Sequence, residues 1–366
     1  MVHTHFILVA VVGLYRIIPE QELLLVVHSV FTCLAIWPTY RLGESVAGGR
    51  HAILCVFALI AFGPFQGVAV ADFRPVVLFL PGLIGVWAST WRSDTKGAVL
   101  WGLIALAGRQ EASYLLVCVG LSILCIRWGA ARRRDAIALI LLGALAWGFF
   151  AIQKPSMFFH INPMSPGTWP SSPELWDHRM LFGGALLLSG WWLGLLAPAP
   201  LVAMLPVLWG LLSTQREWHA LTGPGAHHHV FWIPFVVAAG VAGSARVPRG
   251  LGPIILFVGS AFAFPWVSGV STQSELSRLA QQVPKDAPVA ADYDTIHALA
   301  GRPVLWNIEQ LYMTDRPWHW EGPWPLTVDA VDWILMPVEH SLGQHVSNWV
   351  VVGSASTHIL VRRPQH

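Results

Sequence analysis

The sequence predicts a mainly α, polytopic helical membrane protein with a small α/β domain at its C-terminus. First, 55% of the 366 residues are hydrophobic and only 11% are charged, whereas soluble domains have about 25% charged residues. Second, apolar segments recur until about residue 268, and third, charged and turn residues return after it. We expect an external interfacial helix at 1–21, a transmembrane domain at 22–268 and an extracytoplasmic α/β domain at 269–366.

About ten apolar segments are predicted to cross the membrane, although several are shorter than the ~20 residues of a usual span. They lie at 22–41, 50–63, 76–91, 97–108, 112–127, 136–153, 180–196, 199–212, 230–243 and 251–267. The short apolar run at 5–18 is predicted to lie in the membrane interface instead. The stretches at 63–75, 153–179 and 213–229 are predicted to be external loops.

The charges of the connecting loops predict how the segments are oriented. One set of alternate loops is rich in basic residues, and the opposite loops carry basic and acidic residues in similar numbers. The basic residues of the first set are Arg41, Arg50, Arg92, Lys96, Arg127, Arg132, Arg133, Arg134, Arg246 and Arg249. Because cytoplasmic loops are enriched in Lys and Arg, we expect a multi-pass protein of the cell (inner) membrane whose C-terminal domain is extracytoplasmic.

The C-terminal domain is predicted from short alternating runs that are typical of strands. They lie at 288–292, 303–308, 331–338, 348–353 and 357–363, and helical patterns lie at 272–283 and 293–301.

Composition and motifs also exclude several classes of protein. With a net charge of only +2 and no basic stripe, there is no electrostatic case for a nucleic-acid partner. The four cysteines lie in apolar stretches, so they are interpreted as buried hydrophobic residues, not as a disulfide framework or a metal site. The chain has no Walker loop, no dinucleotide fingerprint after a strand and no zinc-type cluster. Membrane lipids are the partners that the composition implies.

Asp72 and Arg74 are the first candidate site residues, because charges beside a bilayer are costly and usually have a function. They precede Pro75, which suits the first turn of a helix. The alternative interpretation is therefore that Asp72 caps that helix and pairs with Arg74.

Arg109, Gln110 and Glu111 join two apolar segments almost without a loop. The preceding segment is short enough to end inside the bilayer, where irregular polar backbone is tolerated only when it lines a cavity. We expect Glu111 at the floor of an external cavity. The alternative is a tight surface turn in which the arginine and the glutamate pair with each other.

His227 and His229 align only if their stretch is extended, and three consecutive histidines cannot all face one ion. We expect a polar helix entry with a histidine near a phosphate or sugar hydroxyl, and no metal site. Arg179 lies in the long external loop, whose length suggests a binding loop or lid. For these residues a solvated surface is an equal alternative.

Several short motifs together resemble a known family. They are His5 and Phe6 before an apolar run, Pro38–Leu42, Asp72–Pro75, Glu111 after a short helix, the histidines before Ile233–Phe235, VPKDAPVAA at 283–291 and AGRPVLW at 300–306. In these features the chain resembles an uncharacterised prokaryotic family of polytopic membrane proteins, domain of unknown function 2079, which is distantly similar to the GT-C glycosyltransferases.

The resemblance implies an inverting transferase that takes a sugar from a polyprenyl-phosphate carrier at the outer face of the membrane. Family members usually have one more N-terminal helix and a loop with a catalytic Asp, and the present chain begins after that point. Arg74 and Val76 stand where the family tends to have His and Glu, and Arg109-Gln110 stands where it tends to have Lys-Glu. The resemblance therefore leaves open an upstream segment or an inactive family member.

For such a transferase, Asp72 or Glu111 is expected to act as the base. Arg74 and Arg109 are expected to bind the phosphate, with Gln110, Arg179, His227 and His229 as further substrate-binding residues. No motif specifies a cofactor, and a divalent metal that assists the phosphate is left open. The competing interpretation is a non-catalytic membrane protein that binds or transports a lipid carrier.

Overall fold

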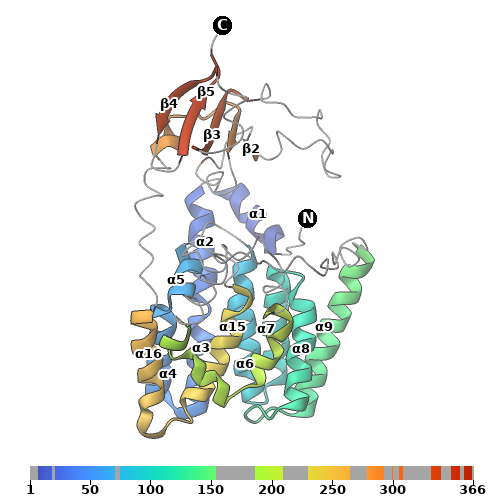
Figure 1. Cartoon of the computed structure of the whole chain (residues 1–366). Helices are drawn as coiled ribbons and strands as arrows, with labels where there is room; N and C mark the ends of the chain where they lie inside the picture. Colours follow the sequence, from blue (N-terminus) through green and yellow to red (C-terminus); the bar gives the residue numbers. More distant parts are fainter. Residues whose placement is uncertain are drawn as a thin grey trace, which may run out of the picture. The chain divides into compact units, whose positions relative to one another are not determined.

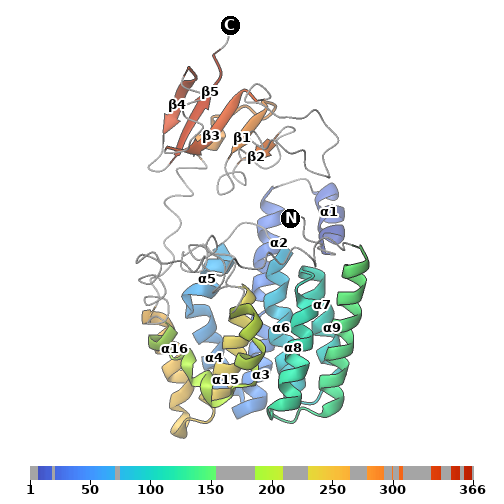
Figure 2. The ribbon, with the colours of Figure 1, turned by 45° about the vertical axis from the view of Figure 1, so that its right-hand side comes forward.

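The computed structural model describes residues 7–18, 21–70, 75–153, 186–208, 230–263, 278–291, 299, 305–307, 331–338, 348–354 and 358–364. The chain divides into two compact units, Met1–Val267 and Ser268–His366, which are considered separately. Figures 1 and 2 show their helices and strands.

The first unit is helical, which confirms the predicted mainly α class. Its first part consists of α1 (Ile7–Ile17), α2 (Gln21–Cys33), α3 (Ile36–Ala47), α4 (Gly49–Ala61), α5 (Gly63–Val70), the 3₁₀ helix η1 (Pro75–Leu78), α6 (Phe79–Trp91), α7 (Thr95–Gly108), α8 (Ala112–Cys125) and α9 (Arg133–Gln153). Among the described residues, the second part includes η2 (Trp191–Leu196), α12 (Ala199–Ala203), α15 (Ile233–Ser244), η4 (Pro248–Gly250) and α16 (Leu251–Ala263).

The number of predicted crossings is supported only in part. Among the described residues, two helices are long and apolar enough to cross a membrane, Leu23–Ala47 and Arg133–Ile152. A third candidate is the pair Gly49–Ala61 and Gly63–Ala69, bent by 67°. Other apolar helices are 10–17 residues long, and α1 is one of them, at the place where the sequence predicts an interfacial helix.

The expectation that residues 63–75 form a loop is wrong for 63–70, which form α5. The glycines and Pro64 suggest a loop, but proline fits the first turn of a helix because that turn needs no backbone donor there. The side-chain amide of Gln66 donates to the carbonyl oxygen of Ile60 (2.9 Å), so the bend between α4 and α5 keeps a hydrogen-bond partner for that carbonyl.

The segments predicted at 180–196 and 199–212 are not continuous α-helices where they are described. Gly190 has φ +78° and precedes η2, and α12 ends at Ala203. Positive φ suits glycine. Such irregular backbone is tolerated at membrane depth when protein covers it, and η2 packs against α15.

Helix α15 forms the centre of the unit, because all of its 12 residues are buried. Its small residues allow close approach: a Cβ on Gly243 would collide with the carbonyl oxygen of Leu193 in η2, and one on Gly240 would collide with the ring of Trp191. Small residues are the usual means by which membrane helices pack closely. The surrounding core includes Trp87, Phe62 and Phe79, all fully buried.

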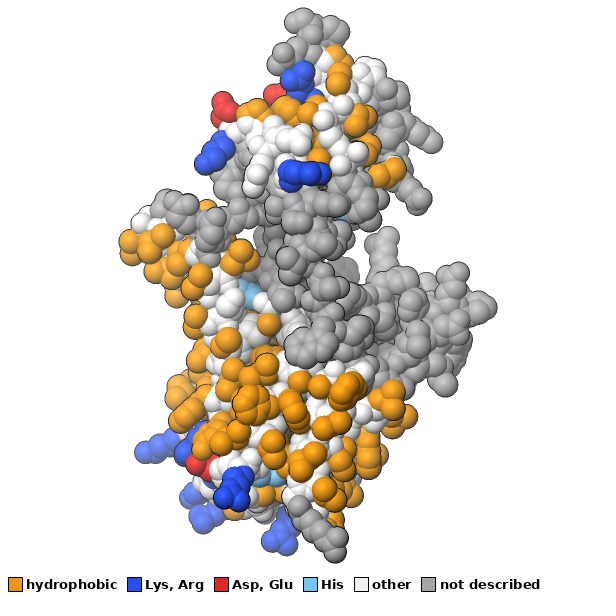
Figure 3. All heavy atoms as spheres, turned by 90° about the vertical axis from the view of Figure 1, so that its left-hand side faces the viewer, with side chains coloured by type: hydrophobic (Ala, Val, Ile, Leu, Met, Phe, Trp, Pro, Cys, Tyr) orange, Lys and Arg blue, Asp and Glu red, His pale blue; other side chains and the backbone are white. Residues whose placement is uncertain are grey.

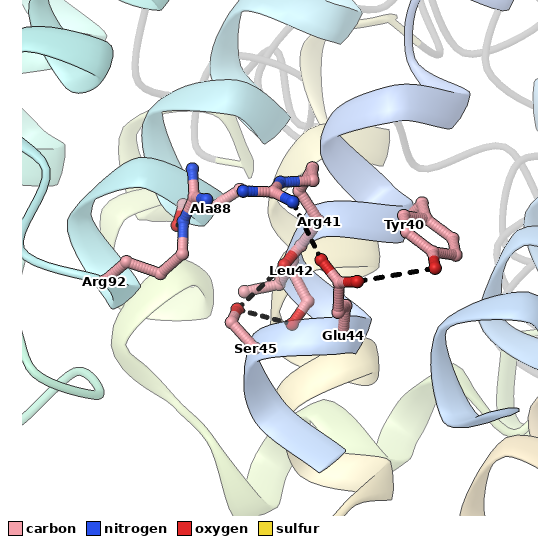
Figure 4. Close-up of polar contacts among 7 residues, drawn as sticks. All are labelled: Tyr40, Arg41, Leu42, Glu44, Ser45, Ala88 and Arg92. Carbon is pink, nitrogen blue, oxygen red and sulfur yellow. Dashed lines mark hydrogen bonds and ion pairs between the residues drawn. The ribbon is translucent and has the colours of Figure 1, made fainter. Parts of the chain in front are cut away.

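The arginine-rich loops lie together at one end of the helical unit. Asp135, at the start of α9, accepts hydrogen bonds from the hydroxyls of Ser93 (3.0 Å) and Thr95 in the α6–α7 connection. On α3, Arg41 donates to Glu44 (2.9 Å), as Figure 4 shows. Figure 3 shows Lys and Arg side chains at the lower end of this unit, below a face covered by hydrophobic side chains. We call this end of the helical unit, where the arginine-rich loops lie, the arginine-rich end.

The second unit contains a five-stranded sheet with the order β2-β1-β3-β5-β4. The strands are β1 (Val289–Ala291), β2 (Leu305–Asn307), β3 (Trp333–Pro337), β4 (Val350–Ser354) and β5 (His358–Arg362). β1 pairs in parallel with β2 and β3, whereas β5 pairs antiparallel with β3 and β4. Four of these strands lie within the runs in which sequence alternation predicts them, and β4 extends one residue beyond its predicted run, to Ser354. Leu279, Leu335 and Leu360 belong to the core of this unit.

Candidate functional site

The candidate site begins at the short turn between α7 and α8. Gly108 ends α7, Arg109 is extended (φ −165°), and α8 starts at Ala112. The amide of Ala112 donates to the carbonyl oxygen of Arg109 (3.2 Å), and the hydroxyl of Ser113 donates to that of Gln110 (2.7 Å). The backbone of the turn is therefore held by local hydrogen bonds, which fix where its charged side chains start.

Arg109 and Glu111 form an ion pair inside this turn. Nε of Arg109 lies 2.9 Å from Oε2 of Glu111, and the two side chains are only 13% and 21% exposed. The guanidinium carbon also lies 4.7 Å from the ring centre of Phe231, a distance suited to a cation–π interaction. The arginine and the glutamate thus pair with each other, as expected for a tight turn. They are also shielded from solvent, as expected if the turn lined a cavity.

The end of α7 lies against η1. A Cβ on Gly108 would lie 3.0 Å from Cβ of Leu78 and 3.2 Å from the carbonyl oxygen of Pro75. Glycine allows this approach because it has no side chain. The Arg109–Glu111 turn is therefore adjacent to the first residue of η1, although more than thirty residues separate them in sequence.

Phe231 connects the same place to the start of α15. Its ring packs edge-on against Phe79 of α6, with 5.4 Å between the ring centres, while its face receives Arg109. Aromatic pairs prefer such edge-on geometry. Phe231, just before α15, therefore packs both on the arginine and on Phe79, and we call Arg109, Glu111 and Phe231 the charged turn site.

The charged turn site lies away from the arginine-rich end. Helix α8 runs from Ala112 at the site to Cys125, next to the α8–α9 connection. With a rise of about 1.5 Å per residue, these 14 residues span about 21 Å. The structure thus separates the mixed-charge turn from the basic loops, as the charge pattern of the sequence predicts.

The other predicted site residues lie outside the described residues: Asp72, Arg74, Arg179, His227 and His229. Of the predicted set, Arg109, Gln110 and Glu111 are described, and each keeps its substrate-binding or catalytic role as a prediction.

His28 is a candidate that the sequence reasoning missed. It is buried in α2, and its Nε2 lies 2.8 Å from the carbonyl oxygen of Val68 in α5. Val68 is four residues before Asp72. A histidine within an otherwise apolar segment is itself a signal, because ionisable residues in spanning segments usually have a function.

The charged turn site offers no set of ligands for a metal ion in the described part of the chain. There, no group of three or more His, Cys, Asp or Glu side chains comes together. Its chemistry is instead that of a guanidinium and a carboxylate, which can bind anions and accept or orient protons.

Comparisons with known proteins agree with the class that the helices define, an integral membrane protein. The family model described as "Predicted membrane protein (DUF2079)" matches residues 2–155, which is less than half of the chain and includes Arg109 and Glu111 of the charged turn site. The resemblance to this family is confirmed over those residues. No curated protein sequence matches the chain.

Among solved structures, the chain is similar to ArnT from Cupriavidus metallidurans. The apo structure aligns with 12% identity and a TM-score of 0.48, covering 93% of this chain and 84% of ArnT. The structure of ArnT bound to undecaprenyl phosphate aligns with 12% identity and a TM-score of 0.42, covering 94% and 85%.

Proposed function

We propose that this protein is an integral-membrane glycosyltransferase of the GT-C type, which uses a polyprenyl-phosphate-linked sugar at the outer face of the membrane. The observation that carries the proposal is the charged turn site, an arginine and a carboxylate shielded from solvent at the end away from the basic loops. By the distribution of basic residues, that end is the external one.

In the sequence, Asp72 comes three residues before Pro75, the first residue of η1, and His229 comes two residues before Phe231, the aromatic partner of Arg109. We assign Asp72 and His229 to the same site on the basis of this sequence proximity.

The proposed reaction uses these groups in distinct roles. A carboxylate, Asp72 or Glu111, accepts the proton of the acceptor hydroxyl as its oxygen forms a bond to the anomeric carbon of the sugar. The bond from that carbon to the phosphate oxygen breaks, and polyprenyl phosphate leaves with the bonding electrons. Arg109 and Arg74 stabilise the phosphate charge. A single displacement of this kind inverts the anomeric carbon.

The ion pair also fits a second function, a non-catalytic protein that binds the lipid carrier. Oε2 of Glu111 lies 2.9 Å from Nε of Arg109. A carboxylate in such an ion pair can orient the guanidinium group toward a phosphate instead of removing a proton. In that case the site binds the phosphate head group without transferring sugar.

Both functions can be tested by incubating membranes that contain the protein with tritium-labelled undecaprenyl-phosphate sugars and measuring sugar transfer. We expect transfer to fall by about a hundredfold or more in Asp72→Asn, the usual contribution of a general base, and to fall also in Glu111→Gln. The matched control is Glu44→Gln, because Glu44 is likewise paired with an arginine but lies at the arginine-rich end.

Unchanged transfer in both site variants would show that the proposed residues are wrong. Binding of the labelled lipid without any transfer by the wild-type protein would favour the carrier-binding function.

A further inference from the structure

We propose a second, separate site at the arginine-rich end: a pocket between the start of α4 and the α15–α16 turn that binds the phosphate group of an anionic phospholipid. The pocket has a volume of about 470 Å³. Residues that line it include Ala47, Arg50, His51, Ser244, Arg246 and Pro253. None of them belongs to the charged turn site.

The charge of the pocket is the first step toward its ligand. Two arginines, Arg50 and Arg246, line it, and no acidic residue is among the described residues that do so. Nη1 of Arg246 donates to the carbonyl oxygen of Leu196 at the end of η2. Since a guanidinium has five N–H donors in a planar fork, this contact orients the group and leaves donors for an anion. Arginine favours phosphate for that reason.

The floor of the pocket is polar and held in place. His51 is 7% exposed, and its Nε2 lies 3.2 Å from the carbonyl oxygen of Val241 and 3.3 Å from the hydroxyl of Ser244. Ser244 in turn donates to the same carbonyl (2.9 Å). These contacts connect α4 to α15, so the two walls that carry Arg50 and Arg246 keep a fixed separation.

The start of α4 adds to the positive potential. Its N-cap is Gly48, which has no side chain to cap the first turn, and the pocket is lined on this side by Ala47, Arg50 and His51. Backbone N–H groups at a helix start carry partial positive charge. They supplement the two guanidinium groups where a phosphate would lie.

A lipid source for the phosphate follows from the neighbouring surface of α4. Arg50, Ile53 and Phe57 are spaced three and four residues apart, so they share one face of the helix. Ile53 and Phe57 line an apolar groove of about 650 Å³ together with Trp37 and Val30. Ile53 is 49% exposed and Phe57 is 51% exposed. If Arg50 binds the phosphate of a phospholipid, an acyl chain of that lipid can therefore lie in the adjacent apolar groove.

The position of the pocket supports the same ligand. Figure 3 shows that hydrophobic side chains cover the helical unit up to the band of Lys and Arg at its lower end. Phospholipid phosphates lie at this boundary in a membrane. Basic pockets between helices on the cytoplasmic side are known to bind anionic head groups, and the basic loops predict that this end is cytoplasmic.

Native mass spectrometry of the purified full-length protein tests the proposal, with three probes in separate arms: phosphatidylglycerol, phosphatidylcholine and inorganic phosphate. We expect phosphatidylglycerol to bind more tightly than phosphatidylcholine. In the double variant Arg50→Gln and Arg246→Gln its binding should fall about tenfold or more, the effect of losing charge-assisted hydrogen bonds. The matched control is Arg127→Gln, because Arg127 is an exposed arginine of the same end outside the pocket.

Ala47→Trp provides an independent variant that keeps every charge. Ala47 is exposed at the rim of the pocket, so the larger ring should fill the space and lower phosphatidylglycerol binding without removing an arginine. A melting temperature close to that of the wild type confirms folding for each variant.

The outcomes separate the two sources of phosphate. Saturable binding of inorganic phosphate that competes fully with phosphatidylglycerol would support the anion site but assign it to a soluble ligand, whereas a preference for the lipid supports the head group. Equal phosphatidylglycerol binding by the wild type, the double variant and Ala47→Trp would overturn the proposal.

Discussion

Replacing Gly143 by alanine should push α9 away from the start of α8 and so disturb the turn that carries Glu111. A Cβ at this position would lie 2.4 Å from the carbonyl oxygen of Ser113 and 3.0 Å from the amide nitrogen of Val117, whereas ordinary contacts begin at 3.4 Å. Backbone atoms cannot rotate aside as a side chain can. The helices must therefore separate by roughly 1 Å, the difference between 2.4 Å and the 3.4 Å of an ordinary contact.

The magnitude follows from two opposing effects. Overpacking of a close interface costs about 1–3 kcal/mol, while alanine within a helix is more favourable than glycine by about 0.5–1 kcal/mol. Gly148 lies in the same helix and has no heavy atom within 4 Å of its added Cβ, so Gly148→Ala gains the second effect alone. The two variants should differ by the overpacking cost, about 1–3 kcal/mol.

Equilibrium unfolding in mixed micelles, with increasing sodium dodecyl sulfate, measures this difference. Gly143→Ala is expected to unfold at lower detergent fraction than the wild type and Gly148→Ala at an equal or higher one. If both variants had the same unfolding free energy, the close approach of α8 and α9 would be refuted. Reduced sugar transfer by Gly143→Ala alone would further connect this packing to the charged turn site.

Two further substitutions, each with a comparison variant, examine buried polar side chains. Asp135→Asn should destabilise the protein by about 1–3 kcal/mol, because the buried carboxylate accepts from Ser93 and from the amide of Arg132 (2.8 Å); Asp94→Asn should change the melting temperature little, since Asn also caps helices well. His28→Leu should cost about 1–3 kcal/mol by removing the partner of the Val68 carbonyl, and His28→Gln should recover part of the loss in the same melting experiment.

Much of the fold could be predicted because membrane helices and sheet strands have different sequence patterns. A membrane helix is a long apolar run, whereas a strand with one buried face alternates between apolar and polar residues. The strand at Trp333–Pro337 follows an alternating run, and the helix at Arg133–Gln153 follows a long apolar one. The break at Gly190 and the helix at Gly63–Val70 were not predicted, because glycine and proline favour a turn or a helix start depending on the backbone around them.

The candidate site was predicted only in part for a related reason. The ion pair of Arg109 and Glu111 joins residues two apart, so local sequence suggests it. The approach of Phe231 to Arg109 joins residues more than a hundred positions apart, and nothing in either segment specifies the other. The same applies to His28 and Val68, whose contact depends on how α2 packs against α5.

The complete burial of α15 has a consequence for the order in which the protein is assembled. This helix is made after α3, α4 and α6, yet it packs against α3 and α6 and is covered on every side. During synthesis the N-terminal part of a chain emerges first, so α3, α4 and α6 are made before the helix that fills the space between them. The packing of this unit is therefore complete only after α15 is inserted and α16 packs against α4 and α15.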